Sequence, residues 1–250
     1  MKRLLSLLAG LLLAAPVAHA QLSPDLIMET YNSNIQVITS GIINKDMLEK
    51  SRRNYEARGN SRSAATRGAT TSMARPHFSL AYVPTAALRQ QTVRALSNKL
   101  LAQNPAAGKA FTDAFASGKA DYGQVFREMV KASGLPPDNA ATAFAAYLEL
   151  GYAIVNKVQD EKLITPAMDR ALQQQAAGIL NQNQTLTSPA AVAKLGEELK
   201  LQAVLLALGW QGARQGGQAE QFRTGIAQQF RSQGLDMSAV RLTTQGLVKK

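Results

Sequence analysis

The sequence has 250 residues, of which 46% are hydrophobic and 18% charged, and its formal net charge is +11. That hydrophobic content is too high for an intrinsically disordered chain and is typical of a globular one. The chain has no cysteine, which excludes disulfide bonds, thiolate zinc sites, iron–sulfur clusters, a thiol nucleophile and a lipid-bearing cysteine.

The first twenty residues have the three parts of a secretory signal peptide. Lys2 and Arg3 give a positive start, residues 4–15 form a short apolar run, and Ala18-His19-Ala20 matches a small-residue cleavage site. Because a membrane-spanning helix needs about 20 apolar residues, an uncleaved anchor is the less favoured alternative. We therefore expect cleavage after Ala20, no transmembrane segment after cleavage, and a periplasmic or secreted protein.

Two segments of different character follow. In residues 21–48, isoleucines and a tyrosine recur at intervals of three and four, which predicts an N-terminal helix. The β-branched run at 35–39 would also suit a strand, so this alternative stays open. Residues 49–78 lack apolar periodicity and are rich in arginine, serine and glycine, which predicts a flexible linker.

The linker carries the clearest functional signal in the sequence. Between residues 51 and 75, a single acid, Glu56, accompanies six arginines: Arg52, Arg53, Arg58, Arg62, Arg67 and Arg75. Guanidinium groups suit phosphates and carboxylates, so these six are candidate weak anion-binding residues for lipid headgroups or other anionic envelope partners. The alternative is a solvated linker whose arginines only keep it extended. We find no specific nucleic-acid-binding motif.

From residue 79 to 248 the pattern is helical after a short extended piece at 79–83. A cap residue or a proline marks each predicted helix start, at Pro84-Thr85, Pro105, Asp121, Pro136-Pro137-Asp138, Thr165-Pro166 and Ser188-Pro189. Gly151 predicts a close neighbouring helix. Residues 209–218 predict a glycine-rich loop, and a last helix ends at Gly234. Together these features predict one all-α, bundle-like domain of five to seven helices.

Part of this region resembles a known family. The residues that carry the resemblance are Gly134-Leu135-Pro136-Pro137-Asp138-Asn139, Ala143-Phe144-Ala145-Ala146-Tyr147 and Asn156. They are similar to a family of secreted bacterial proteins known only as a domain of unknown function, and the similarity extends from Tyr82-Val83-Pro84 to Leu242-Thr243 and Gly246. The resemblance implies an exported helical domain and transfers no site residue.

Metal and triad chemistry lack the residues they need. After residue 20 the chain has one histidine, His77, and no Gly-x-Ser-x-Gly elbow. A histidine zinc site needs more ligands, and a serine–histidine–acid triad would depend on that single residue. We expect no metal, no cofactor and an ordinary surface histidine.

Carboxylate pairs hydrolyse glycosidic bonds in many enzymes, and the candidates here are Asp121, Asp138, Glu149, Asp160, Glu161, Glu197 and Glu198. A helical wheel places Glu149, Glu197 and Glu198 on solvated faces, which does not suit a catalytic acid. We therefore predict a non-enzymatic binding or scaffolding protein with an unknown protein partner or an anionic envelope partner. The alternatives are a cell-envelope glycan hydrolase with an acid pair, or a small-molecule or lipid carrier.

Overall fold

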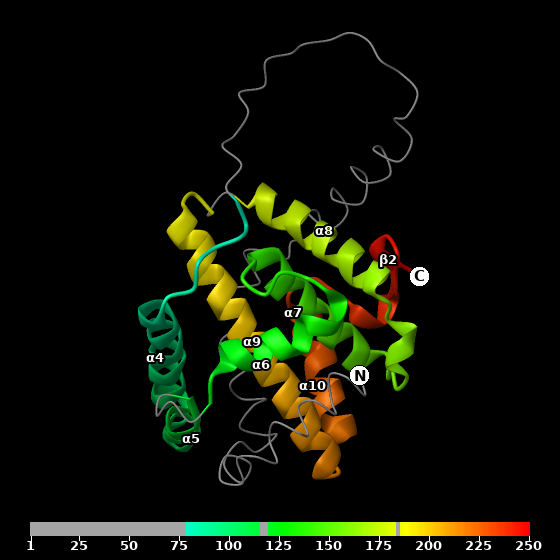
Figure 1. Cartoon of the computed structure of the whole chain (residues 1–250). Helices are drawn as coiled ribbons and strands as arrows, with labels where there is room; N and C mark the ends of the chain where they lie inside the picture. The colour runs from blue at the N-terminus through cyan, green and yellow to red at the C-terminus, as the bar shows by residue number, and fades with distance from the viewer. Residues whose placement is uncertain (1–78, 116–119, 184–185) are drawn as a thin grey trace.

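The computed structural model of the protein describes residues 79–115, 120–183 and 186–250, apart from the side chain of Glu161. The predicted signal peptide, the predicted helix at 21–48, the linker with its six arginines, and His77 lie outside the described residues. The described part contains seven α-helices, three short 3₁₀ helices and one β-hairpin (Figure 1). The α-helices are α4 Ala86–Gln103, α5 Pro105–Phe115, α6 Tyr122–Val130, α7 Ala140–Val155, α8 Pro166–Gln182, α9 Pro189–Gln215 and α10 Ala219–Ser232.

The predicted helix starts are confirmed, and capping explains them. The hydroxyls of Thr85, Thr165 and Ser188 accept hydrogen bonds from the backbone N–H groups of α4, α8 and α9. Proline occupies the first helical position of α8 and α9, where no N–H is needed. Asn139 caps α7, one residue later than the expected Asp138, and the carboxylate of Asp138 contacts Lys200 instead.

Helix α9 lies at the centre of the fold. It contacts α4, α6, α7 and α10, so it is enclosed on several sides (Figure 1). The prediction of a loop at 209–218 is wrong, because α9 continues to Gln215. Each helical glycine costs only about 1 kcal/mol relative to alanine, and burial of Gly209 and Ala213 offsets that cost. The chain turns at Gly217, whose φ is 72°.

Helices α7 and α10 approach each other closely, which confirms the close neighbouring helix predicted at Gly151. A Cβ atom at Gly151 would overlap the ring of Phe230, so only glycine admits that ring. The Phe230 ring also packs against Tyr147, with ring centroids 5.1 Å apart. Both aromatic residues are fully buried, which places this contact in the hydrophobic core.

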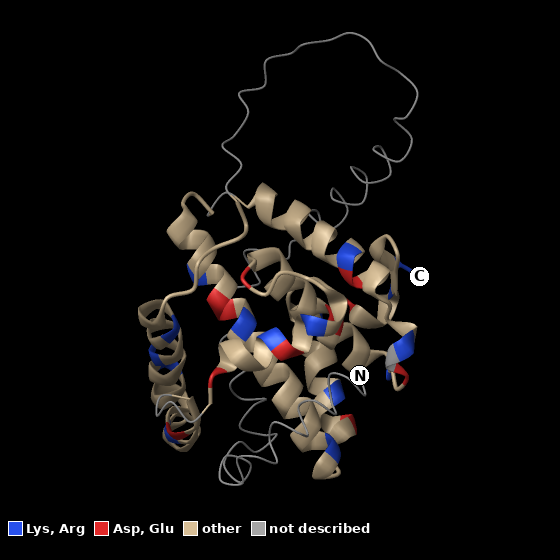
Figure 2. Cartoon of the chain, viewed as in Figure 1, with Lys and Arg blue, Asp and Glu red and all other residues tan. Residues whose placement is uncertain are grey.

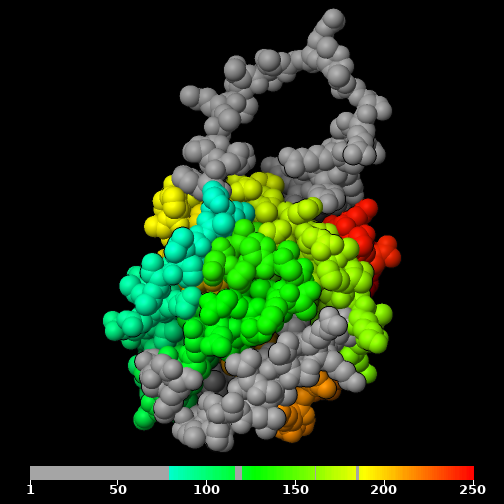
Figure 3. Space-filling model, in the orientation of Figure 1, coloured from blue at the N-terminus to red at the C-terminus, as the bar shows by residue number. Residues whose placement is uncertain are grey.

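Helices α4 and α5 form a hairpin. The side chain of Asn104 accepts a hydrogen bond from the Ala107 N–H at the start of α5, and Gly108 brings α5 against the backbone of Leu101. The hairpin reaches α9 through α4. In the space-filling view, the green residues of the middle of the chain fill the face between α4 and α8 (Figure 3).

The C-terminus forms a β-hairpin that the all-α prediction did not anticipate. Strands β1 (Val240–Thr243) and β2 (Gly246–Lys249) are antiparallel, with Val240 opposite Lys249. The hairpin packs on α8, where the amide of Gln175 donates to the Leu247 carbonyl (3.0 Å) and accepts from its N–H (2.8 Å). Four-residue strands carry little sequence signal, and an isolated hairpin is marginally stable, so the packing on α8 stabilises it. The helical prediction is otherwise confirmed.

The extended piece predicted at 79–83 is confirmed, and we refer to residues 79–85 as the strap. Ala81 forms an antiparallel bridge with Asn139. Tyr82 donates its backbone N–H to the Asp138 carbonyl (3.0 Å), and Ala140 donates to the Leu80 carbonyl (2.8 Å). The strap therefore lies along the start of α7. Among the residues that the structure describes, no helix is long and apolar enough to cross a membrane.

Candidate functional site

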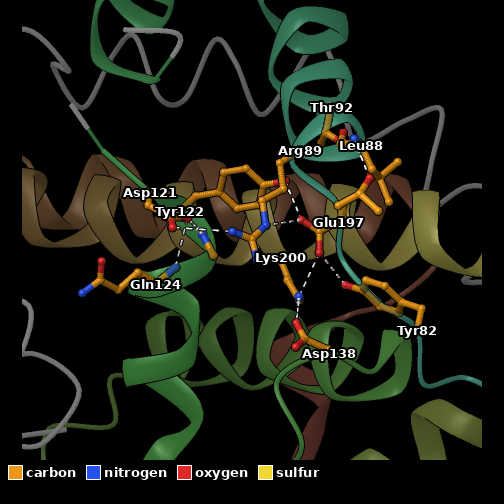
Figure 4. A network of polar contacts seen from close by, with 12 residues as sticks. Tyr82, Leu88, Arg89, Thr92, Asp121, Tyr122, Gln124, Asp138, Glu197 and Lys200 are labelled. Atoms are coloured by element: carbon orange, nitrogen blue, oxygen red, sulfur yellow. Dashed lines mark hydrogen bonds and ion pairs between the residues drawn. The ribbon is translucent and has the colours of Figure 1, made fainter. Parts of the chain in front are cut away.

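A cluster of polar and charged side chains lies where the strap, α4, α6, α7 and α9 meet (Figure 4). We call it the Glu197 cluster, after its central residue. Its members are Tyr82 on the strap, Arg89 on α4, Asp121 and Tyr122 at the start of α6, Asp138 just before α7, and Glu197 and Lys200 on α9.

Glu197 is the centre of this cluster, and its side chain is 0% exposed. One carboxylate oxygen, Oε1, accepts from the Tyr82 hydroxyl (2.9 Å) and from Lys200 Nζ (2.8 Å). The other, Oε2, accepts from the Tyr122 hydroxyl at 2.6 Å. A buried carboxylate needs this number of donors, because desolvation without them would cost several kcal/mol.

Lys200 is the buried cation of the cluster, with its side chain 1% exposed. Besides Glu197, its ammonium contacts Asp138 Oδ1 at 2.6 Å. It also lies 4.8 Å from the ring centroid of Tyr82 and 5.9 Å from that of Phe126. Two carboxylates and two aromatic faces thus replace the water that the ammonium loses on burial.

The cluster reaches the surface through its outer carboxylates. The side chains of Asp138 and Asp121 are 34% and 45% exposed. Arg89 lies between Asp121 and the centre, with its NH1 3.5 Å from Asp121 Oδ2 and its Nε 3.8 Å from Glu197 Oε2. Asp121 also caps α6 by accepting from the N–H groups of Gly123 and Gln124. The cluster therefore has partly exposed carboxylates at its two ends, Asp138 and Asp121, and the buried Glu197 and Lys200 between them.

The two phenols in the cluster act as hydrogen-bond donors. Burial raises the pKa of Tyr82 and of Tyr122, and the nearby negative charge of Glu197 raises both pKa values further. Both phenols consequently keep their protons throughout the physiological pH range. Glu197, with donors on both oxygens, has no free lone pair directed at solvent and is not placed to act as a general base.

The close fit of the strap against α9 depends on a glycine. A Cβ atom on Gly196 would overlap the ring of Tyr82, so any larger residue there would push the ring off α9. Gly196 precedes Glu197 directly, so the notch for the ring and the acceptor for its hydroxyl come from consecutive residues. The strap, 115 positions away in sequence, supplies the matching group.

The prediction that Glu197 lies on a solvated face is wrong. Its helical-wheel position is opposite Val192 and Leu199, but α9 is enclosed on that side as well, by the strap and by α6. Glu198 lies mostly buried, 4.0 Å from Lys194, and burial raises its pKa. A helical wheel describes one helix and contains no information about which elements cover its second face.

Glu149 on α7 also departs from the solvated-face prediction, because it is only partly exposed. Burial raises the pKa of Glu149, and the Asp169 carboxyl on α8 raises it further. Burial also raises the pKa of Asp169, an effect that its hydrogen bond with Glu149 offsets in part. The remaining candidate, Asp160, is exposed and accepts from the Lys162 N–H, and the Glu161 side chain lies outside the described residues.

The acid pair in the Glu197 cluster is not arranged for glycoside hydrolysis. Oxygens of Glu197 and Asp138 both lie within 2.8 Å of the Lys200 ammonium, which occupies the space where a scissile bond would have to bind. Glu197 is also closed to solvent. Across the described ranges, no group of three or more His, Asp or Glu side chains is placed to hold a metal ion.

Four members of the cluster were not predicted from the sequence as site residues: Tyr82, Arg89, Tyr122 and Lys200. One available signal was the pair Glu197 and Lys200, which lie three residues apart inside a largely apolar helix. Ionised residues about one turn apart on a buried helix need partners, so the pair indicates that polar groups from elsewhere reach it. The six predicted anion-binding arginines all lie outside the described residues.

Comparisons with known proteins give one positive result. A search of curated proteins and a search of solved structures each found no match. A family model matches residues 1–250 and is described as a family of unknown function, DUF6683. That result agrees with the resemblance carried by the Gly134–Asn139 and Ala143–Tyr147 segments. The chain belongs to the DUF6683 family.

Proposed function

We propose that this protein is an exported, non-enzymatic binding or scaffolding protein that attaches weakly to an anionic surface of the cell envelope. The observation that carries the proposal is the concentration of charge in one short segment. Six arginines and one acid lie between residues 51 and 75, out of 28 basic and 17 acidic residues in the whole chain. Attraction of such a segment to anionic headgroups is worth about 1 kcal/mol per basic residue near the surface.

The charge distribution in the described domain supports a division of roles. Basic and acidic positions are interspersed along its helices, including adjacent positions on α9 (Figure 2). The most concentrated charges, in the Glu197 cluster, pair with one another, and the central pair Glu197 and Lys200 is buried. The arginine segment, in contrast, has almost no acids of its own. The segment is therefore the better candidate for attachment, and the helical domain for contact with a protein partner.

The connection between the two parts also supports this proposal. The last arginine, Arg75, lies four residues before the strap, and the strap is fixed to α7 and α9 by backbone hydrogen bonds and by Tyr82. Attachment through the arginines would therefore act close to a part of the domain that these hydrogen bonds hold in place. The packed Glu197 cluster supports the non-enzymatic part, because its groups neutralise one another.

A vesicle-binding experiment tests the attachment. Residues 21–250 are mixed with vesicles of phosphatidylcholine that contain increasing phosphatidylglycerol, and bound protein is measured by sedimentation at rising salt. We expect binding that grows with anionic lipid and weakens with salt. Replacing all six arginines by glutamine should lower the partition coefficient by more than about tenfold.

A matched control separates the segment from net charge. Arg94, Arg127, Lys162, Arg170, Arg214 and Arg241 are six exposed basic residues of the described domain, and replacing them by glutamine removes the same formal charge. This variant should bind nearly as well as the wild type. Equal losses in the two variants, or binding that does not respond to salt, would refute attachment through the arginine segment.

A further inference from the structure

The strap lies on the domain in the way that an extended peptide lies in a recognition site. Its backbone pairs with residues 138–140 at the start of α7 through two hydrogen bonds, of 3.0 and 2.8 Å. Its side chains alternate as in a strand. Leu80 and Tyr82 pack against the core, whereas Ala81 and Val83 are exposed, Val83 by 82%. Backbone hydrogen bonds combined with sites for alternate side chains are one common mode of peptide recognition.

The Tyr82 side chain fits a notch on α9 that is formed by Gly196, Glu197 and Lys200, and we call these three residues the tyrosine notch. Gly196 leaves room for the ring, because a Cβ atom there would overlap it. Glu197 Oε1 accepts from the hydroxyl at 2.9 Å, and the Lys200 ammonium lies 4.8 Å from the ring centroid (Figure 4). A phenylalanine ring would leave the buried Glu197 one donor short, so the notch favours a phenol over a phenyl ring.

The charged side chains of the notch are also held in position by residues outside the strap. Glu197 accepts from the Tyr122 hydroxyl at 2.6 Å, and its Oε2 lies 3.8 Å from Arg89 Nε. Lys200 contacts Asp138 at 2.6 Å. Helix α9 itself packs against α4, α6, α7 and α10. The notch should therefore keep its shape when the tyrosine leaves, and such pre-organisation favours binding of another ligand of the same chemistry.

We propose that the tyrosine notch is a binding site for a tyrosine carried by an extended segment of a partner protein, and that the strap occupies this site in cis. A partner segment with a leucine two positions before a tyrosine, as in Leu80 and Tyr82, makes the same contacts and displaces the strap. Without a partner, the strap covers the notch and keeps Glu197 and Lys200 away from water.

This inference rests on the protein-contact part of the proposed function and names the chemistry of the partner. The strap competes with the partner as an intramolecular ligand, so its effective concentration sets how tightly a free peptide has to bind. The test contains no lipid. Failure of peptide binding and failure of vesicle binding are therefore separate results.

Fluorescence anisotropy with a labelled peptide tests the site. The probe is the sequence of the strap, Ser79–Thr85, with blocked ends, and a matched peptide carries phenylalanine in place of its tyrosine. The Tyr82→Ala variant of residues 21–250 has a vacant notch. We expect it to bind the tyrosine peptide at least about tenfold more tightly than the phenylalanine peptide, because only the phenol donates to Glu197. The wild type should bind the tyrosine peptide at least about tenfold more weakly than this variant, because its own strap competes.

Two further variants complete the test. Adding Gly196→Ala to Tyr82→Ala narrows the notch, which should weaken binding of the tyrosine peptide by about tenfold or more. Tyr82→Phe keeps the ring but removes the hydroxyl of the strap, so the tyrosine peptide should bind it about tenfold more tightly than it binds the wild type. This variant decides the question if circular dichroism shows that Tyr82→Ala does not fold. The proposal is overturned if the tyrosine peptide binds no folded Tyr82 variant, if the two peptides bind equally, or if Gly196→Ala leaves binding unchanged.

Discussion

The Glu197 cluster and the contact between Tyr147 and Gln233 are both buried sites between helices, yet they satisfy their polar groups in different ways. In the Glu197 cluster, ionised groups pair directly with side chains from five elements. At the other site, the neutral Tyr147 phenol on α7 interacts with the neutral side chain of Gln233 on α10. Burial of an isolated ion costs far more than burial of an amide. The protein therefore has to supply every partner for its charges, whereas neutral groups tolerate incomplete pairing.

The largest effect should follow from removing the central charge. The Glu197→Gln substitution leaves the buried Lys200 ammonium with Asp138 as its remaining carboxylate partner, and we expect a loss of about 3–5 kcal/mol in the free energy of unfolding. Urea denaturation followed by circular dichroism measures it.

The double variant Glu197→Leu with Lys200→Met is the control for this prediction. It removes both buried charges of the pair and keeps similar volume, so it should be more stable than the single Glu197→Gln variant. A single variant within about 1 kcal/mol of the wild type would show that the pair is not what stabilises this interface.

A set of tyrosine-to-phenylalanine substitutions compares the two sites directly. Tyr82→Phe and Tyr122→Phe each remove a hydrogen bond to the Glu197 carboxylate, which should cost about 1.5–3 kcal/mol in unfolding free energy. Tyr147→Phe removes a hydroxyl that interacts with the neutral side chain of Gln233, so its cost should stay below about 1.5 kcal/mol. Equal costs in all three variants would contradict the distinction between the sites.

The Gly196→Ala substitution tests the contact between the strap and α9 without changing any charge. The added methyl group overlaps the Tyr82 ring, and overpacking of this kind costs about 1–3 kcal/mol. In a Tyr82→Ala background the same substitution should cost much less, because the ring is gone. Additive effects in this double-mutant cycle, measured by urea unfolding, would show that the ring and Gly196 do not interact.

The smallest effect concerns the dependence of stability on pH, through Glu149 and Asp169. Both carboxyl groups have a raised pKa in the folded protein, so the folded state binds protons more tightly than the unfolded state. This pair therefore favours folding below the ordinary carboxyl pKa, and its contribution is lost as pH rises through the raised values. Glu149→Gln should flatten the fall in unfolding free energy above pH 4.5, the ordinary value for glutamate. A slope unchanged from the wild type would rule out this pair as its source.

The sequence predicted those parts of the fold that depend on interactions between residues close together in the chain. Thr165-Pro166 and Ser188-Pro189 start α8 and α9 because capping and a fixed proline φ act within one turn. The loop predicted at 209–218 failed because tertiary burial of Gly209 overrides its weak helix propensity. The hairpin at 240–249 was missed because its support comes from Gln175 on a distant helix.

The site was harder to predict than the fold, because its partners are far apart in sequence. Tyr82 and Glu197 are 115 residues apart, and no periodicity connects them. The wheel for α9 identified an apolar face at Leu199 but gave no sign that the opposite face is covered by the strap. The dipeptide Gly196-Glu197 does not by itself indicate a site. Only the structure shows that Gly196 leaves room for the Tyr82 ring.

The pairing of Gln175 with Leu247 has a consequence for self-association. A two-stranded hairpin exposes unpaired edges, and an exposed edge is a template on which strands of other molecules add. Here a side-chain amide from α8 takes the hydrogen-bonding place that a third strand would fill at Leu247. The backbone of Leu247, in the middle of that edge of β2, is therefore not available for strand addition by another molecule.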